Sequence, residues 1–322
     1  MPMNETFETY TFPSADGTSR CCGIAVLPND EPRALMLISH GMAEHVKRYL
    51  PFMRALAACG ILAFGHDHIG HGASVSAESD LGYLPRKNGA DVLVTDVIRD
   101  AERFRGCYPD VPLILFGHSM GSFVARIAAA SSHASLFDAM VLSGTGSKNP
   151  LSPIAMAVLS VLCTIRGEKA HSKTMLSMMF DPYSAHFEKR TSYDWLTTDT
   201  NAVDRYIADP LCGFPLFTVS GLYVLTKLLH DANAEKTCLS TPEALPILLI
   251  SGRDDPVGNM GDGIHEVADA YTDAGCTCVS HTLYTGARHE LLNEPIAAQV
   301  ITELLAWIDR NLNVLSKRST PT

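Results

Sequence analysis

The sequence predicts an α/β fold built on a mostly parallel sheet of eight strands that is flanked by helices. Short runs of β-branched and large apolar residues recur along the chain, and most of the later runs are continuous rather than alternating. Continuous apolar strands are buried on both faces, as in a parallel sheet covered by helices. Segments with the helical spacing of apolar residues separate these runs, which is the alternation of an α/β fold.

The predicted strands begin with two that form a hairpin. The turn signal Ser14-Ala15-Asp16-Gly17 separates the first two apolar runs, so we expect them to pair antiparallel at one edge of the sheet. The eight runs are Phe7–Phe12, Cys22–Leu27, Ala34–Ser39, Ile61–Gly65, Pro112–Phe116, Ala139–Ser143, Pro246–Ser251 and Val279–Tyr284.

Four segments of the same region carry apolar residues at helical spacing. They are Leu50–Cys59, Gly89–Cys107, the Ala-rich Ser122–Ala130 and Leu291–Leu312.

The alternation of strands and helices breaks after Ser143. About 100 residues pass before the next predicted strand at Pro246, and loops of that length are not structureless in compact domains. The segment has helical parts and holds much of the aromatic content of the chain. We therefore expect a helical cap subdomain at residues 147–235, inserted after the sixth strand of a core formed by residues 1–146 and 236–322.

Composition narrows the classes of partner. The formal net charge of the chain is -10. An acidic chain repels nucleic acid and anionic membrane surfaces, so neither is expected as a main partner. Neutral or apolar small molecules fit this charge better.

The termini and cysteines indicate the cytoplasm. The first residues, MPMNETFETYTF, contain neither the basic start nor the apolar core of a signal peptide. The longest apolar stretch, Pro153–Ile165, is shorter than the roughly 20 residues of a membrane span. The nine cysteines are odd in number and scattered, which does not fit a disulfide framework.

The segment FGHSMGSFV (116–124) places Ser119 between two glycines, directly after a buried strand and before an Ala-rich helix. A G-x-S-x-G turn in that position is so tight that its flanking residues must lack side chains, and the serine hydroxyl then stands free at the end of the sheet. We expect Ser119 to be a nucleophile. The N–H of Met120, at the start of the following helix, points into the space in front of it.

The strand Ala34–Ser39 ends in His40-Gly41-Met42. A strand that ends in His-Gly can offer a backbone N–H to a developing oxyanion, here the N–H of Met42. Glu44 and Arg48 lie one helical turn apart, and we expect this pair to brace the oxyanion loop rather than to contact substrate.

Candidates for an acid and a base follow the last two predicted strands. Asp254 and Asp255 come after Pro246–Ser251. Asp255 precedes a proline, which keeps it extended, so we favour Asp255 as the orienting acid and assign Asp254 to solvent or capping. His289 lies after the final strand, which gives the chain order serine, aspartate, histidine of a hydrolase triad.

The loop His66–His71 is rich in possible metal ligands. Histidine and aspartate at that density can hold zinc. However, Gly70 stands where binuclear hydrolases place an acidic residue, and no second cluster of ligands follows downstream. We therefore expect a structural loop whose histidines are hydrogen-bonded in place, with no metal and no cofactor.

Five motifs together resemble the monoacylglycerol lipase and lysophospholipase group of α/β-hydrolases. They are HGMAEHVKRY (40–49), GHDHIGHGAS (65–74), GHSMGS (117–122), SGRDDPVG (251–258) and GARHE (286–290), in this order. The resemblance spans the whole core. It implies the α/β-hydrolase fold, a Ser119–Asp255–His289 triad, an oxyanion hole formed by Met42 and Met120, and esters of fatty acids as substrates. It also implies that the histidine-rich loop is structural.

The substrate prediction depends on the cap. The segment from Leu151 to Leu162 is apolar almost all round a helix, so it is buried or faces lipid. Methionines at 175, 178 and 179 could add an adaptable apolar lining. An acyl tunnel under such a roof favours monoacylglycerols or lysophospholipids, with the cap in transient contact with a membrane or micelle.

Other functions stay open. An aminopeptidase on this fold would need acidic residues in the cap to hold an ammonium group, and Asp194, Asp199 and Asp204 are the candidates. A short-chain esterase, a zinc hydrolase using the His66–His71 loop, and a non-catalytic binder on a hydrolase scaffold are the remaining alternatives.

Overall fold

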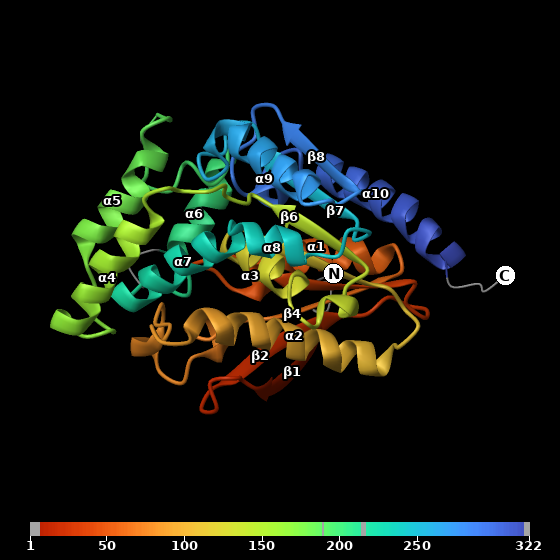
Figure 1. Cartoon of the computed structure of the whole chain (residues 1–322), viewed down its shortest axis with the longest axis horizontal. Coiled ribbons are helices and arrows are strands. Elements are labelled where there is room, and N and C mark those ends of the chain that lie inside the picture. The colour runs from red at the N-terminus through yellow and green to blue at the C-terminus, as the bar shows by residue number, and fades with distance from the viewer. Residues whose placement is uncertain (1–6, 189, 214–216, 319–322) are drawn as a thin grey trace.

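The computed structural model describes residues 7–188, 190–213 and 217–318. Within these residues eight strands form one sheet, in the order β1-β2-β4-β3-β5-β6-β7-β8 (Figure 1). β1 and β2 pair antiparallel, as do β2 and β4, and all neighbours from β4 through β3 to β8 are parallel. The predicted fold class, a mostly parallel eight-stranded sheet, is confirmed.

The strands lie where the apolar runs predict them, with ends shifted by no more than two residues. They are β1 (Glu8–Pro13), β2 (Arg20–Val26), β3 (Ala34–Ser39), β4 (Ile61–His66), β5 (Leu113–His118), β6 (Ala139–Ser143), β7 (Ile247–Gly252) and β8 (Val279–Tyr284). The β1–β2 hairpin is closed by the predicted turn, in which the Asp16 carboxylate accepts the N–H groups of Thr18 and Ser19.

Helices cover both faces of the sheet because successive strand residues point to opposite sides. In β3, Leu35 and Leu37 pack on one face, and Met36 and Ile38 pack on the other. The first face is covered by α2 (Gly89–Cys107), α3 (Met120–Ala129) and α9 (Asp262–Asp273). The second is covered by α1 (Leu50–Ala58) and α10 (Ala297–Arg318). The continuous apolar strands are thus buried on both faces, as predicted.

Two helical predictions need correction. The helix expected at Leu291–Leu312 begins later, at Ala297, after a short 3-10 turn at Leu291–Asn293. Glu294 is extended because it precedes Pro295, and the residue before a proline avoids the helical region. The second correction is α9, a helix that is absent from the four segments predicted from the sequence.

Five further helices lie between β6 and β7, the place of the predicted insertion. They are α4 (Ser152–Arg166), α5 (Lys173–Ser184), α6 (Thr200–Ala208), α7 (Val219–Ala232) and α8 (Glu235–Ser240) in the described part of the chain. α4 packs on α7, and α7 packs on α3 of the core. Figure 1 shows α4 and α5 together at the end of the molecule opposite the C-terminus. Over the residues described, we find no helix with the length and apolar character needed to cross a bilayer.

Candidate active site

Ser119 lies at the junction of β5 and α3 in a backbone conformation that few residues adopt. Its φ is 50° and its ψ is -121°. A Cβ on Gly117 would lie 2.5 Å from the Gly121 oxygen, and a Cβ on Gly121 would lie 2.0 Å from the Ser39 oxygen. Only glycine fits either position, which explains the G-x-S-x-G spacing and keeps the strained serine at the carboxyl end of the sheet.

The structure brings Asp255 and His289 together from the loops after β7 and β8. His289 Nδ1 donates to Asp255 Oδ2 at 2.9 Å, and both side chains are buried. Asp255 also accepts from Ser251 Oγ at 3.0 Å and from the N–H of Val257 at 2.9 Å. Asp254 is half-buried, and its N–H donates to the Ala287 carbonyl. The residue that precedes the proline therefore pairs with the histidine.

The electrostatics of this pair suit a base held by a carboxylate. Burial alone would raise the pKa of Asp255, but the charge and hydrogen bond of His289 lower it below the ordinary value. Burial alone would lower the pKa of His289, but Asp255 raises it above the ordinary value. The imidazolium form of His289 is therefore stabilised next to an ionised Asp255.

Ser119 and His289 line the same cavity. The ring of His118, the residue before Ser119, lies 4.7 Å from the ring of His289 between centroids, and the ring of Trp195 lies 5.0 Å from it. On the remaining side, a Cβ added to Gly144 would lie 2.9 Å from the His289 ring. The imidazole of His289 is thus packed between the rings of His118 and Trp195 and the backbone of Gly144, which has no side chain.

The loop after β3 (residues 40–45, here the β3 loop) faces Ser119. A Cβ on Gly41 would lie 3.2 Å from the Ser119 Cβ. His40 Nδ1 donates to the Gly41 carbonyl at 2.7 Å, which fixes the peptide plane that carries the N–H of Met42. In the part of the chain that the structure describes, that N–H donates no hydrogen bond. Met120 is the first residue of α3, so its N–H also lies outside the helical ladder.

The β3 loop is itself strained and is held by the segment between β6 and β7. Ala43 has a φ of 57°, an uncommon value for a residue with a side chain. Its carbonyl accepts from the Tyr206 hydroxyl at 2.9 Å and from the N–H of Gly213 at 3.0 Å. Both partners belong to the segment between β6 and β7, so that segment helps to shape the loop.

The histidine-rich loop after β4 supports the β3 loop from below. Asp67 accepts the N–H groups of Val46 and Ala73 through its two oxygens. His68 donates its N–H to His40 Nε2 at 3.0 Å, and burial keeps the pKa of His40 well below its ordinary value. His40 is therefore a neutral ring that accepts on one side and donates on the other.

The described residues contain one group whose side chains could hold a metal, and it is not this loop. Ligand atoms of His45, Asp209 and Cys212 all lie within 4.8 Å of one another. His45 Nε2 already lies 2.9 Å from Asp209 Oδ2, and this hydrogen bond joins the β3 loop to the turn after α6. In the histidine-rich loop, side chains instead bond to the protein: His66 to Asp100, and His71 to the Ile69 carbonyl.

A cavity of about 750 Å³ opens above Ser119. α4 and α5 contribute much of its apolar lining, including Ile154, Val158, Met175, Met179 and Phe180. Ser119, His289 and the β3 loop form its floor. The volume suits a drug-sized or larger apolar ligand.

The acidic residues considered for an ammonium site are otherwise engaged. Asp194 accepts from the N–H groups of Arg190 and Thr191, and Asp204 is paired with Arg190 at 2.6 Å. Asp199 caps the N-terminus of α6. None of the three lines the described cavity.

Sequence reasoning missed Gly144, Trp195 and Glu290 at this site. Gly144 follows a buried strand directly, which is a signal for a close backbone approach. Trp195 carries no local signal, because only the packing of the inserted segment brings it to His289. Glu290 stands next to His289 in the GARHE motif, but its role depends on a partner more than 200 residues away, Arg48.

Comparisons with known proteins show the family of the chain. The model of the family described as Serine aminopeptidase, S33 (Hydrolase_4) matches residues 30–296. The monoglyceride lipase of Mus musculus is 27% identical over 288 residues, 88% of this chain and 85% of that protein. The monoacylglycerol lipase of Mycolicibacterium smegmatis is 27% identical over 297 residues, 88% of this chain and 91% of that protein.

Solved structures give the same result. A carboxyl esterase from Bacillus coagulans, in complex with glycerol, matches with a TM-score of 0.89 and 26% identity over 95% of this chain and 99% of that one. The resemblance to monoacylglycerol lipases noted from the five motifs is thus confirmed. Because its model covers most of the sequence, the chain belongs to the Hydrolase_4 (serine aminopeptidase, S33) family and has the α/β-hydrolase fold.

Proposed function

We propose that this member of the family is a carboxylic ester hydrolase that cleaves fatty-acid monoesters through an acyl-serine intermediate. The observation that carries the proposal is the buried His289–Asp255 hydrogen bond of 2.9 Å, in the same cavity as a serine held at a φ of 50°. Such an arrangement activates a hydroxyl that is otherwise a weak nucleophile.

The mechanism follows from the hydrogen bonds. Asp255 accepts the Nδ1–H of His289, so Nε2 is free to take the proton of Ser119. As the Ser119 oxygen bonds to the ester carbon, the carbonyl electron pair moves to its oxygen. The N–H groups of Met42 and Met120 hold this oxyanion, each contributing about 3 kcal/mol.

The intermediate then breaks down in two stages. The C–O bond to the alcohol cleaves, and the alcohol leaves with the proton that His289 had taken. Water next attacks the acyl-serine and gives its proton to His289. When the carbon–Ser119 bond breaks, that proton returns to the serine and the fatty acid departs.

The substrate class rests on the cavity. We assign residues 147–235 as a cap over a core of residues 1–146 and 236–322, and α4 and α5 of this cap supply the apolar wall opposite Ser119. Met175, Met178 and Met179 all line it, and methionine adapts to chains of different shape. A long acyl chain would fill this wall, which favours monoacylglycerol or lysophospholipid over acetyl esters. The names of the monoglyceride lipase relatives agree with the first of these.

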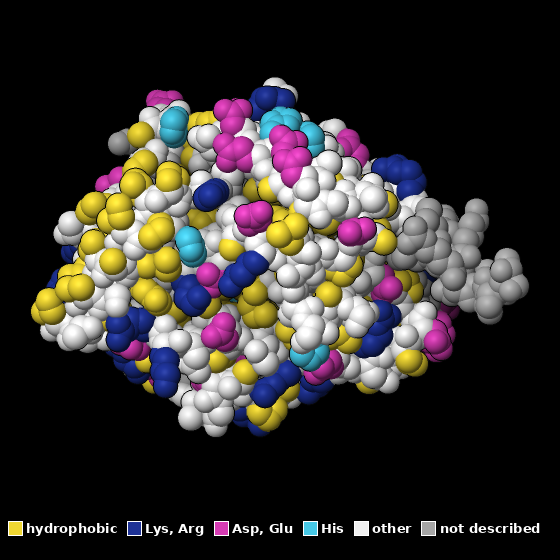
Figure 2. Space-filling model, viewed as in Figure 1, with side chains coloured by type: hydrophobic (Ala, Val, Ile, Leu, Met, Phe, Trp, Pro, Cys, Tyr) yellow, Lys and Arg dark blue, Asp and Glu magenta, His cyan; other side chains and the backbone are white. Residues whose placement is uncertain are grey.

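We further propose that the cap contacts a lipid surface. Figure 2 shows hydrophobic side chains gathered at the end of the molecule where α4 and α5 lie in Figure 1. Leu151, Ile154, Val158 and Met178 are largely exposed and also line the cavity, so the apolar surface continues inward to the serine. A lipid could pass from bilayer or micelle to cavity without its chain crossing water. The nine free thiols suit a reducing compartment such as the cytoplasm.

The family description names an aminopeptidase, and the geometry favours ester hydrolysis over it. An N-terminal ammonium group needs a carboxylate that is free to pair with it. Asp194, Asp199 and Asp204 are bound by Arg190, Thr191 or a helix N-terminus. Of the carboxylates in the cavity lining, Glu44 and Glu290 are bound by Arg48, and Glu266 lies on α9. The residues that α4 and α5 contribute to the lining include no carboxylate.

An ester panel tests the proposal. Hydrolysis of monoacylglycerols, lysophospholipids and p-nitrophenyl esters would be measured across acyl lengths, with an aminoacyl amide alongside. We expect activity to increase from acetyl towards long chains, to vanish in Ser119→Ala, and to persist in Ser131→Ala, a serine just beyond the end of α3. A maximum at acetyl, cleavage of the amide alone, or a fully active Ser119→Ala would overturn it.

A further inference from the structure

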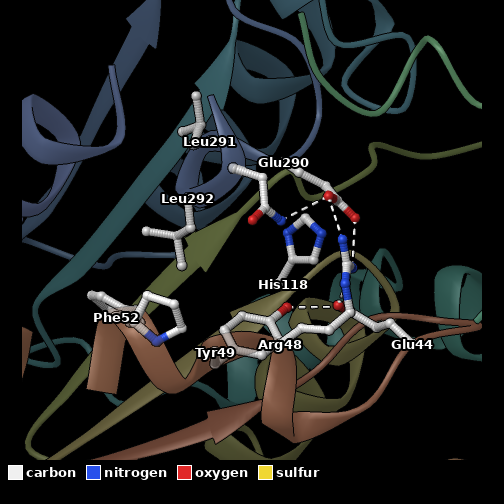
Figure 3. Close-up of a pocket in the computed structure, with 10 residues that line it drawn as sticks. Glu44, Arg48, Tyr49, Phe52, His118, Glu290, Leu291 and Leu292 are labelled. Carbon is white, nitrogen blue, oxygen red and sulfur yellow. Dashed lines mark hydrogen bonds and ion pairs between the residues drawn. The ribbon is translucent and has the colours of Figure 1, made fainter. Parts of the chain in front are cut away.

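A cluster of buried ions lies between the β3 loop and the loop that carries His289. Arg48 donates to Glu44 Oε2 at 2.7 Å and to both oxygens of Glu290 at 2.8 and 2.7 Å. Figure 3 shows the guanidinium between the two carboxylates. The side chains of Arg48, Glu44 and Glu290 are only 14%, 4% and 6% exposed. Burying ions this deeply costs desolvation free energy. The cluster is therefore weak evidence for added stability, and its presence indicates a role other than stabilising the fold.

One end of the cluster reaches the backbone that faces Ser119. Glu44 Oε1 accepts the N–H of Gly41 at 2.6 Å and the hydroxyl of Tyr49 at 2.8 Å. The next peptide along the chain carries the N–H of Met42. The position of the Glu44 carboxylate therefore sets the position of the proposed oxyanion donor.

The other end reaches the proposed base. Glu290 follows His289 directly, accepts from Asn293 Nδ2 at 2.8 Å, and donates its N–H to the Leu196 carbonyl at 2.7 Å. The bidentate pair with Arg48 fixes the Glu290 carboxylate in direction as well as in distance. A shift of this side chain would be transmitted through one peptide to the imidazole.

We propose that Arg48 is a positioning residue, which holds the β3 loop and the His289 loop in register so that oxyanion donor and base act on the same carbonyl. This inference rests on the proposed function. Arg48 touches neither substrate nor proton in this scheme. It acts through Glu44 on the Met42 N–H and through Glu290 on His289.

The charges around His289 provide a second test of the proposal, through the pKa of His289. Burial lowers the pKa of His289, while Asp255, Glu290 and Glu44 raise it, and the net shift is upward. The buried ring of His118 faces His289 from β5, with a pKa lowered to about 4 by burial and by His289 itself. Removing a carboxylate of the cluster should therefore lower the pKa of the base, and removing the cation should raise it.

The experiment compares Arg48→Met, Arg48→Lys and Glu290→Gln with the wild type on one long-chain ester over a pH series. We expect kcat of Arg48→Met to fall about 10- to 100-fold, with little change in KM, because a small misplacement of catalytic groups is costly. Arg48→Lys should recover part of kcat, since an ammonium can pair with one carboxylate but cannot bridge two in a fork. The acid limb of kcat/KM should move to lower pH in Glu290→Gln and to higher pH in Arg48→Met.

Arg105→Met is the matched control. Arg105 also pairs with a carboxylate, that of Asp138 at 2.5 Å, and it lies outside the described cavity lining. It should lose stability without a change in kcat or in the pH profile. Wild-type kcat and an unmoved pH profile in folded Arg48→Met would overturn the inference while leaving the proposed function intact. If Arg48→Met does not fold, the same two readouts in Glu290→Gln and Arg48→Lys decide it. A wild-type chain that cleaves no ester would instead overturn the proposed function, and this inference with it.

Discussion

Ser119 shows how a single residue can be specified by its neighbours. Its positive φ is costly for a residue with a side chain, and it persists because the glycines at 117 and 121 let β3, β5 and α3 approach closely. The same two glycines make the position visible in the sequence.

The choice between two adjacent aspartates gives a test at this scale. Asp255→Asn should lower kcat about 10³- to 10⁴-fold, because an amide cannot hold the His289 tautomer that leaves Nε2 free. Asp254→Asn is the matched control. We expect it to leave kcat unchanged, because Asp254 is half-buried and His289 pairs with Asp255 instead. Steady-state kinetics on one ester, with circular dichroism to check folding, would distinguish them. Equal losses in both variants would contradict the assignment.

Gly144 tests how tightly the imidazole is held. Its φ is 58°, and a Cβ there would lie 2.9 Å from the His289 ring, so Gly144→Ala should displace the base and lower kcat at least tenfold. Gly286 has a φ of 77° with no neighbour within 4 Å of its Cβ position. Gly286→Ala should therefore suffer the same backbone strain of about 1–2 kcal/mol, seen in thermal unfolding, without the loss of kcat. Unaltered kcat in Gly144→Ala would show that the ring has more room than the structure allows.

Whether a residue of the site could be predicted from the sequence depends on how far along the chain its contacts lie. Ser119, Asp255 and His289 each follow a predicted strand, so position along the chain was enough to propose them. The contacts of Trp195 with His289, and of Arg48 with Glu290, join segments about 90 and 240 residues apart. No local sequence pattern indicates that residues so far apart in the chain are in contact.

At the scale of elements, most strands and helices could be predicted because each buried face leaves a periodic pattern. α9 was missed, although it carries one: Ile264, Val267, Ala268 and Tyr271 are buried at helical spacing. The start of α10 was wrong because the apolar residues at 291 and 292 continue the pattern across a break made by Glu294-Pro295. The spacing of apolar residues alone does not show that a proline interrupts the helix.

α4 faces two environments, which its sequence alone could not reveal. The helix is apolar on nearly every side, yet only Ser152, Leu159 and Cys163 are buried. Val161 and Ile165 are 56% and 74% exposed and lie outside the cavity lining. α4 therefore has one part that packs against the rest of the protein, one part that lines the cavity and one part that faces outward.

Those outward side chains allow the lipid-surface proposal to be tested apart from the cavity. Val161→Asp combined with Ile165→Asp should reduce co-sedimentation with phosphatidylcholine vesicles about tenfold or more, since each apolar side chain contributes on the order of 1–3 kcal/mol when buried. Hydrolysis of a soluble p-nitrophenyl ester should not change. Leu239→Asp, at an exposed position on α8, is the control. Vesicle binding equal to that of the wild type would rule out contact through this face of α4.

At the scale of the whole molecule, the loops of the proposed active site pack against a buried layer of neutral histidines. Burial lowers the pKa of His40 and His68 well below the ordinary value, and it lowers the pKa of His71 to about 4. The unfolded chain therefore binds more protons than the folded chain between about pH 4 and pH 6.5. The contribution of these groups to stability is complete above pH 6.5 and declines as the pH falls below it, for His71 down to about pH 4.

His71 makes this prediction quantitative. A shift from 6.5 to about 4 costs about 2 kcal/mol of folding free energy on going from pH 7.5 to pH 5. His71→Gln should show a correspondingly shallower dependence of urea unfolding free energy on pH, whatever its stability at pH 7.5. His133→Gln, at an exposed position, should leave the slope unchanged. A slope equal to that of the wild type in His71→Gln would mean that His71 is not buried as a neutral ring.

The architecture as a whole was more predictable than the cavity. Eight runs and their order define the sheet, and its five central strands, β3 to β7, are buried at every residue. A strand buried on both faces tolerates few polar residues, so these five are the clearest in the sequence. The shape of the cavity depends on how α4–α8 pack over that sheet, and their sequences record only that they are helical and apolar. Acyl length and head group therefore have to be measured.

The proposed function requires that Ser119 is the residue activated by His289 and Asp255. Peptide mapping by mass spectrometry after treatment with an alkyl fluorophosphonate tests this requirement. We expect one adduct, on Ser119, formed at a rate that falls at least a hundredfold in His289→Ala and that matches the loss of ester turnover. An adduct on another residue, or unmodified Ser119 in a protein whose esterase activity has been abolished by the reagent, would contradict it.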